Sequence, residues 1–153
     1  MRKLTLSLIL SLVVFVASAA GISNYKELLA FAKAVNKEAD ISMWQNEKGV
    51  VCLSADIDMK KGKKFPGIET FKGVLNGCGH KLYNWEAKNS FCTRVAPESV
   101  IKNLVIDASC KFTAKTAYND DVQMFAFITK INRGYIINCE SYGTIEHTAE
   151  GAT

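Results

Sequence analysis

The spacing of hydrophobic positions changes once along the chain, near residue 50, and divides it into two kinds of structure. Before that point apolar residues recur every three or four positions, at Tyr25, Leu28, Leu29, Ala32 and Val35. This spacing places them on one face of an α-helix. Asn24 followed by Glu27 fits a variant of the capping box, with Ser23 as an alternative cap, and Asn36-Lys37 is the predicted end. Because the helix has a single apolar stripe, we expect it to lie as a lid on the β structure that follows.

From Val51 to Met59 the period becomes two, with apolar residues at odd positions and small or acidic residues at even positions. Strict alternation of this kind predicts a half-buried strand. Asp56 and Asp58 then lie together on its unburied face. Such a pair suits calcium binding or acid/base chemistry, but no third carboxylate or histidine is close in sequence, which favours a solvated outer face.

Short apolar segments then repeat. Phe91–Val95 aligns position for position with Phe127–Ile131, and Val100–Leu104 aligns with Tyr135–Cys139; Lys81–Trp85 is a fainter third copy. Each copy of the second segment has an asparagine at the same place, at Asn84, Asn103 and Asn138. Recurrence at this interval predicts a repeat fold, a solenoid in which stacked turns build one continuous core.

The three asparagines predict bends between strands, because asparagine tolerates left-handed backbone and bonds to neighbouring backbone groups. Stacked copies would also bond to each other as a ladder. Their steps are 19 and 35 residues, and the longer step contains Lys115–Asp121, which we interpret as a loop insertion.

The glycines Gly73, Gly77 and Gly79 allow three interpretations. A phosphate-binding loop requires a helix after it, whereas the next segment is strand-like. An Asn76-Gly77 hairpin turn is the second alternative. We favour the third, a corner of the repeat at which glycine supplies positive φ. His80 is then a polar turn residue.

The first twenty residues have the order of a secretory signal: basic Arg2 and Lys3, an apolar run from Leu4 to Val16, and small residues at 17–20. The run is too short to span a bilayer. The chain has 19 basic and 15 acidic residues, and two of the basic ones lie in the signal, so the mature chain would be nearly balanced at 17 to 15. This balance argues against a nucleic-acid partner.

Five cysteines follow the signal, at Cys52, Cys78, Cys92, Cys110 and Cys139. Their spacings match no zinc pattern, and we expect no metal and no cofactor. Export permits disulfides, but the odd number leaves at least one thiol over, and the spacing does not say which cysteines pair.

Three segments together, Leu53–Met59, Phe71–Leu82 and Val100–Leu104, resemble exported right-handed parallel β-helix proteins from the surfaces of Bacteroides-type gut bacteria. These include the adhesin-like proteins with a GLUG motif. The middle segment fits the pattern F-x-G-x-x-x-G-x-G-H-x-I, with matches at Phe71, Gly73, Gly77, Gly79 and His80 and a leucine for the isoleucine. The resemblance covers about Asn24 to His147. It departs at Lys64–Ile68, which replaces a Trp-x-Pro-Ile-Gly stretch, and at Cys78, where a polar residue is usual.

The resemblance implies a mainly β fold, a right-handed parallel β-helix of the pectin-lyase-like solenoid type with an N-terminal capping helix. The chain then divides into a signal peptide at 1–20, the capping helix and link at 21–48, and β-helix repeats at 49–153, which either end there or continue in a longer protein. A cell-surface or secreted location is implied, with the periplasm as an alternative. The family supplies no catalytic residues.

Three functions stay open. The first is a noncatalytic, adhesin-like module that binds a glycan or a surface protein, and its candidate contacts are Trp44, Trp85, Tyr118 and Asn119, with Tyr142 as a further aromatic. The alternative for the aromatic residues is packing in the core or the lid, and for the insertion that carries Tyr118 it is a tolerated surface loop. The second is a polysaccharide lyase or hydrolase with Asp56, Asp58, Asp107 and Arg94 or Arg133. The third is a passive spacer. We expect no membrane span in the mature chain. At the C-terminal edge of the repeats, either the parent protein continues or the edge pairs with a partner or with a second copy of this chain.

Overall fold

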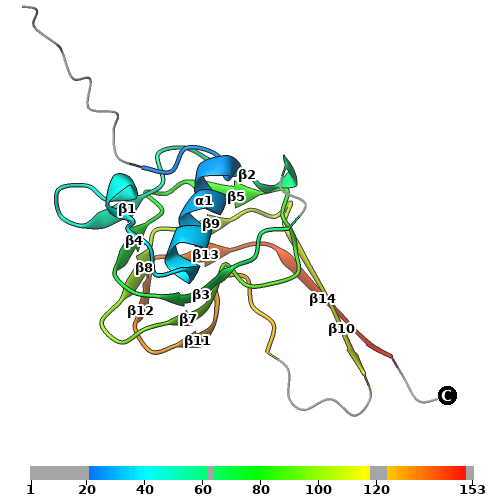
Figure 1. The fold of residues 1–153 in the computed structure, drawn as a ribbon. Coiled ribbons are helices and arrows are strands. Elements are labelled where there is room, and N and C mark those ends of the chain that lie inside the picture. The colour runs from blue at the N-terminus through cyan, green and yellow to red at the C-terminus, as the bar shows by residue number, and fades with distance from the viewer. Residues whose placement is uncertain (1–20, 62–63, 118–123, 151–153) are drawn as a thin grey trace, which may run out of the picture.

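The structure is a computed structural model that describes residues 21–61, 64–117 and 124–150 (Figure 1). The predicted signal peptide, residues 1–20, lies outside these ranges. The described part contains the α-helix α1 (Tyr25–Asn36), the short 3-10 helices η1 (Ser42–Trp44) and η2 (Met59–Lys61), and strands β1 to β14. Within it, no helix has the length and apolar character needed to cross a bilayer.

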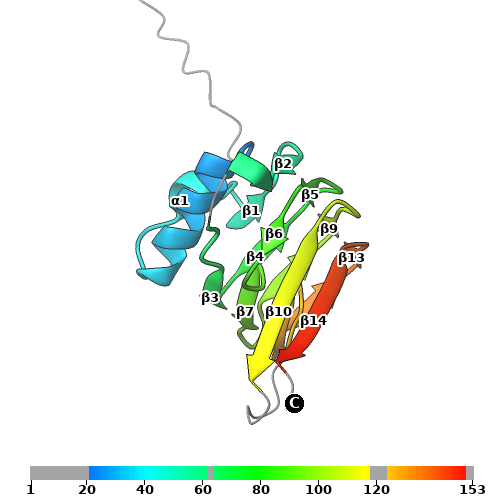
Figure 2. The same ribbon diagram turned by 90° about the vertical axis from the view of Figure 1, so that its right-hand side faces the viewer.

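Helix α1 begins and ends where the sequence predicts. The Asn24 side chain accepts a hydrogen bond from the Glu27 N–H at 3.1 Å, and the Glu27 carboxylate accepts one from the Ser23 N–H at 2.7 Å. These two bonds form the capping-box variant. The helix buries Leu28, Phe31 and Ala32 against the strands, and Figure 2 shows it at one end of the stacked sheets. The expected lid is therefore present.

The strands form four short parallel sheets. The first contains β1 (Val50–Cys52), β4 (Val74–Asn76), β8 (Val100–Lys102) and β12 (Tyr135–Ile137). The second contains β2 (Ile57–Asp58), β5 (Lys81–Tyr83), β9 (Val105–Ile106) and β13 (Glu140–Ser141). The third contains β3 (Ile68–Phe71), β7 (Cys92–Val95) and β11 (Thr129–Asn132), and the fourth contains β6 (Glu86–Ala87), β10 (Lys111–Ala117) and β14 (Thr144–Glu150).

This arrangement corrects the predicted fold class. The chain is mainly β, but the prediction of a single right-handed β-helix solenoid is wrong, because the strands are divided among four separate parallel sheets of three or four strands each. The physical reason lies in strand length. Twelve strands have only two to four residues, so each ladder breaks at a bend before it becomes an extended sheet; β10 and β14 have seven residues each.

The spacing of paired strands also differs from the predicted repeat. In the first sheet Val50 pairs with Val74, Val74 with Val100 and Val100 with Tyr135, which are steps of 24, 26 and 35 residues. Lys81–Tyr83, the supposed third copy of this segment, is β5 and pairs with β2 and β9 of the second sheet. Strands β7 and β11 align one residue away from the predicted register, with Cys92 opposite Thr129.

The predicted strand Val51–Met59 is two strands, β1 and β2, separated by a bend. Its alternation of burial is nevertheless present: Val51, Leu53, Ile57 and Met59 are all buried. The side-chain pattern thus describes which residues face the core, although the backbone ladder is interrupted.

The predicted left-handed bends are confirmed. Asn84, Asn103 and Asn138 have φ angles of 54°, 53° and 50°. The sequence predicts that stacked copies of these asparagines bond to each other. The described bonds have other partners: Asn103 Nδ2 donates to Asn76 Oδ1 at 2.9 Å, and Asn84 Nδ2 donates to Asp58 Oδ1 at 3.2 Å.

The glycine corner has two kinds of glycine. Gly73 and Gly79 have φ angles of 111° and 79°, as expected for bends. Gly77 has another role, because a Cβ at this position would lie 2.4 Å from the Asn103 carbonyl oxygen. Gly77 is required for the close approach of two chain segments.

Candidate functional site

The outer face of the second sheet carries a dense set of polar and aromatic side chains. Its middle positions Ile57, Leu82 and Ile106 are paired side by side and fully buried, so the residues before and after them point to solvent. The register places the outward residues in two columns across the strands. One column is Asp58, Tyr83, Asp107 and Tyr142, and the other is Asp56, Lys81, Val105 and Glu140. We call these eight residues the outer strip; Figure 1 shows its four strands one below another.

Hydrogen bonds connect the strip from one strand to the next. Asp56 Oδ1 accepts the Lys81 backbone N–H at 3.1 Å and lies 3.1 Å from His80 Nδ1. The Lys81 ammonium in turn donates to Asp107 Oδ2 at 3.0 Å. These contacts span β2, β5 and β9, so the side chains are held by residues of three different segments.

The column that contains Asp107 and Tyr142 is fixed in a similar way. Asp107 Oδ1 accepts the Ser109 hydroxyl at 2.7 Å and the Ser109 N–H at 3.0 Å. The Ser109 hydroxyl oxygen accepts the Asn84 N–H at 2.8 Å. At the last strand the Tyr142 hydroxyl donates to Glu140 Oε2 at 2.5 Å.

These contacts lower the pKa of two carboxylates of the strip, Asp107 and Asp56. The Ser109 hydroxyl and amide, with Lys81, lower the pKa of Asp107 to about 2. The Lys81 backbone N–H lowers the pKa of Asp56, and the bond to Asp107 raises the pKa of Lys81. The Glu140 carboxylate raises the pKa of Tyr142. At neutral pH the two aspartates are hydrogen-bond acceptors, whereas a general acid needs a pKa near the working pH.

The structure places the predicted contact residues differently from expectation. Trp44 and Trp85 are only 7% and 3% exposed. Trp44 packs against Phe31, and Trp85 packs against Phe65 and Phe127, so neither indole offers a face to a ligand. The prediction for these two residues is therefore wrong, because both complete the core. Tyr118 and Asn119 lie outside the described residues.

Tyr142, by contrast, is 62% exposed on the outer strip. Sequence reasoning missed Tyr83 and Lys81 as members of the same face. The signal was present in the segment Lys81–Tyr83, where polar and aromatic residues flank one buried leucine, but its partners in space were unknown.

The residues suggested for an enzyme are only partly brought together. Asp56, Asp58 and Asp107 share the outer strip. Arg94 lies on β7 of the third sheet, and Arg133 follows β11 of that sheet. Lys81 is a cation that contacts a carboxylate of the strip, since its ammonium lies 3.0 Å from Asp107 Oδ2. Among the described residues, no group of three or more histidines, cysteines or acidic residues is arranged to hold a metal ion.

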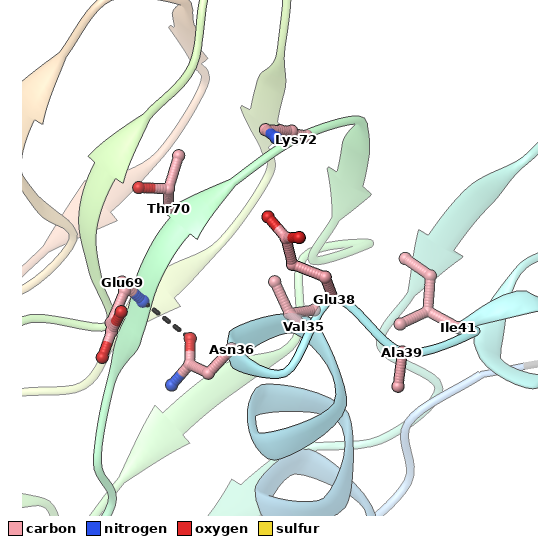
Figure 3. A pocket seen from close by; sticks show the side chains of 8 residues that line it. All are labelled: Val35, Asn36, Glu38, Ala39, Ile41, Glu69, Thr70 and Lys72. Carbon is pink, nitrogen blue, oxygen red and sulfur yellow. Dashed lines mark hydrogen bonds between the residues drawn. The ribbon is translucent and has the colours of Figure 1, made fainter.

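A groove of about 450 Å³ lies between the end of α1 and the edge strand β3 (Figure 3). Asn36 connects the two elements, since its Nδ2 donates to Gly67 O at 2.9 Å and its Oδ1 accepts the Glu69 N–H at 2.8 Å. Glu38 has a left-handed φ of 53° just after the helix and lies at the rim with Lys72. The amide of Asn36 fastens the helix to the sheet edge, and the groove is the space beside this attachment.

Comparisons with protein-family models, with curated proteins and with solved structures find no match for this chain. The resemblance to surface proteins of Bacteroides-type bacteria therefore stays a prediction.

Proposed function

We propose that this protein is an exported, noncatalytic binding module whose outer strip binds a glycan. The observation that carries the proposal is the column Asp58, Tyr83, Asp107 and Tyr142, in which carboxylates and phenol rings alternate across four adjacent strands. Export is supported by the signal-like order of the first twenty residues.

The chemistry of this column suits a polyhydroxylated chain. Sugar hydroxyls donate to carboxylates, and the C–H faces of sugar rings pack on aromatic rings, whose polar end stays in water. Neighbouring strands are about 4.8 Å apart, so four strands offer a row of contacts about 15 Å long. Such a row matches a chain of several sugar units that crosses the strands.

The side chains of the outer strip are preorganised before a ligand binds, which supports a binding role. Lys81, Asp107 and Ser109 are already held by hydrogen bonds at 2.7 to 3.0 Å. A ligand then loses less free energy to side-chain ordering, which is a major opposing cost in association.

The pKa shifts support a noncatalytic role. Glycoside hydrolysis needs one carboxyl group that stays protonated long enough to act as an acid. Asp56 and Asp107 have lowered pKa values, so both are acceptors at neutral pH. A lyase or hydrolase is the second candidate, because four carboxylates share this face: Asp56, Asp58, Asp107 and Glu140.

The test measures binding and product release on the same immobilised mucin glycans, pectins and glycosaminoglycans. We expect the Tyr83→Ala, Tyr142→Ala double variant to bind its glycan at least about tenfold more weakly, a loss of about 1.4 kcal/mol. Tyr135→Ala is the matched control, since Tyr135 is 58% exposed on another sheet.

Four results would contradict the proposal. An equal loss of glycan affinity in Tyr135→Ala would show that binding is not specific to the outer strip. Product release that disappears in Asp107→Asn would show an enzyme. Binding to a surface protein but to none of the glycans would favour a protein ligand. Absence of any binding would favour a passive spacer.

A further inference from the structure

Cys52 and Cys78 lie close together on the outer face of the first sheet. Cys52 ends β1 between Val51 and Leu53, which are both 1% exposed, so its side chain points away from the core. Its partner on the neighbouring strand is Asn76. Cys78 follows two residues later, where the chain turns with a φ of 55°.

The turn brings the Cys78 sulfur back towards β1. Its Sγ lies 3.7 Å from the Asn76 carbonyl oxygen, and this same oxygen accepts the Leu53 N–H at 2.9 Å. The Cys78 sulfur therefore lies beside the Cys52–Leu53 peptide. Burial and, after it, the neighbouring Cys78 thiol raise the pKa of Cys52, which agrees with this closeness of the two cysteines.

We propose that Cys52 and Cys78 form a disulfide that joins β1 to the turn after β4. The proposal rests on the exported location in the proposed function, since structural disulfides persist in oxidising compartments. Only Gly77 separates Cys78 from the end of β4 at Asn76, so the bond would join β1 to a residue held close to the neighbouring strand.

Formation of the bond requires a disulfide oxidant, R–S–S–R. The thiolate of Cys78, the more exposed of the two cysteines, attacks one sulfur of the oxidant, forms a mixed disulfide and releases RS⁻. The Cys52 thiolate then attacks Cys78 Sγ and releases the second RS⁻. The two cysteine protons appear on the two released thiols, so one oxidant is reduced for each protein disulfide formed. Burial raises the pKa of Cys52, and the second step therefore becomes faster as pH rises.

The other three cysteines have different surroundings. Cys92 and Cys110 are 0% and 1% exposed, and burial raises the pKa of Cys92 to about 11. Burial also raises the pKa of Cys110 and of the half-buried Cys139. Buried, protonated thiols react slowly with disulfides. Burial thus sets Cys92 and Cys110 apart from the pair. Cys139 is half-buried like Cys52, but its sulfur lies 3.5 Å from the carbonyl oxygens of Ile101 and Ile137. One pair and three single cysteines account for the odd number.

Peptide mapping gives a direct test. The purified full chain is treated with oxidised glutathione, alkylated and digested with trypsin, which places Cys52 and Cys78 in the separate peptides 49–60 and 73–81. We expect these two peptides as one cross-linked species, two hydrogen atoms lighter than their sum. Glutathione on Cys78 without the cross-link, or a cross-link from either residue to Cys139, would overturn the proposal.

Thermal unfolding supplies a second measurement. Reduction of the oxidised wild-type protein should lower its midpoint by about 10 °C, because the bond restricts the unfolded chain. Cys52→Ser and Cys78→Ser should both lose this response, whereas the control Cys139→Ser should keep it. A reduction response that persists in Cys52→Ser would overturn the assignment. These readouts need no ligand, so failure of glycan binding alone would contradict the proposed function and leave the disulfide standing.

Discussion

At the N-terminal edge of the sheets, α1 covers β3 with Leu28, Phe31 and Ala32 fully buried. At the C-terminal edge, formed by β11 to β14, Tyr135, Ile137, Tyr142 and Ile145 are between 44% and 62% exposed. Figure 2 shows the helix on one side of the stacked strands and β14 on the other.

The difference shows that the burial of apolar side chains at an edge depends on the element that covers this edge. The end strands β1 to β3 and β11 to β14 are mostly equally short, but only the first group has an amphipathic helix in contact with it in the described structure. Uncovered strand edges expose backbone groups and apolar side chains, and repeated strand layers need an end cap. We expect the N-terminal edge to resist unfolding and the C-terminal edge to open first; self-association there stays a prediction.

The largest effect should come from Phe31→Ala. Phe31 is fully buried and contacts Trp44 and Phe71, with ring centroids 5.7 and 6.4 Å away. We expect a loss of about 3–5 kcal/mol in the free energy of unfolding, measured by urea denaturation. Ile145→Ala, at a side chain that is 45% exposed, is the control at the other edge and should cost under about 1 kcal/mol. Similar losses in both variants would show that the two edges do not differ in stability.

Glycine substitutions should give a smaller contrast. A Cβ at Gly77 would lie 2.4 Å from the Asn103 carbonyl oxygen, and one at Gly134 would lie 2.3 Å from the Ser99 carbonyl oxygen. The clashes are alike, but Gly77 follows β4, which has β1 on one side and β8 on the other. Gly134 precedes β12, the last strand of the same sheet. We expect Gly77→Ala to cost about 2–3 kcal/mol and Gly134→Ala about 1 kcal/mol, because the edge can shift outward. The reverse order would show that the C-terminal edge is the more rigid.

Hydrogen exchange followed by mass spectrometry sharpens the comparison without any mutation. The amide of Gly77 donates to Lys102 O in the middle of the stack, and the amide of Thr144 donates to Cys110 O at the C-terminal edge. Local opening should be easier where one neighbour is missing, so we expect Thr144 to exchange at least about tenfold faster. Equal protection of the two amides would remove the predicted difference in local stability.

The smallest effects should be electrostatic. The pKa of Asp107 is lowered to about 2 in the folded protein by Ser109 and Lys81, so its contribution to stability is complete above the unfolded value of about 3.9 and is lost as pH falls towards 2. Asp107→Asn should flatten the acid side of a stability–pH curve in this window. At the C-terminal edge, Lys111 and Glu146 are 2.8 Å apart and about half exposed, so Lys111→Ala should change stability by under about 0.5 kcal/mol. An unchanged acid slope in Asp107→Asn would contradict the hydrogen-bonded strip.

Features that depend on a few neighbouring residues could be predicted from the sequence. The cap at Asn24 involves a residue three positions away, and the helix face follows from a period of 3.6. The buried positions from Val51 to Met59 follow from the period of two, and the left-handed bends follow from the short polar side chain of asparagine.

Features that depend on strand pairing were decided by the tertiary structure. Lys81–Tyr83 and Val100–Lys102 have the same local pattern, yet they belong to different sheets, because pairing depends on the path of the chain between them. For the same reason the sequence did not show that Trp85 fills the core, that Tyr83 and Tyr142 share a face, or that the turn at Cys78 lies beside Cys52. Local side-chain patterns determine which face of a segment is buried, whereas only the packed chain determines which segments lie beside each other.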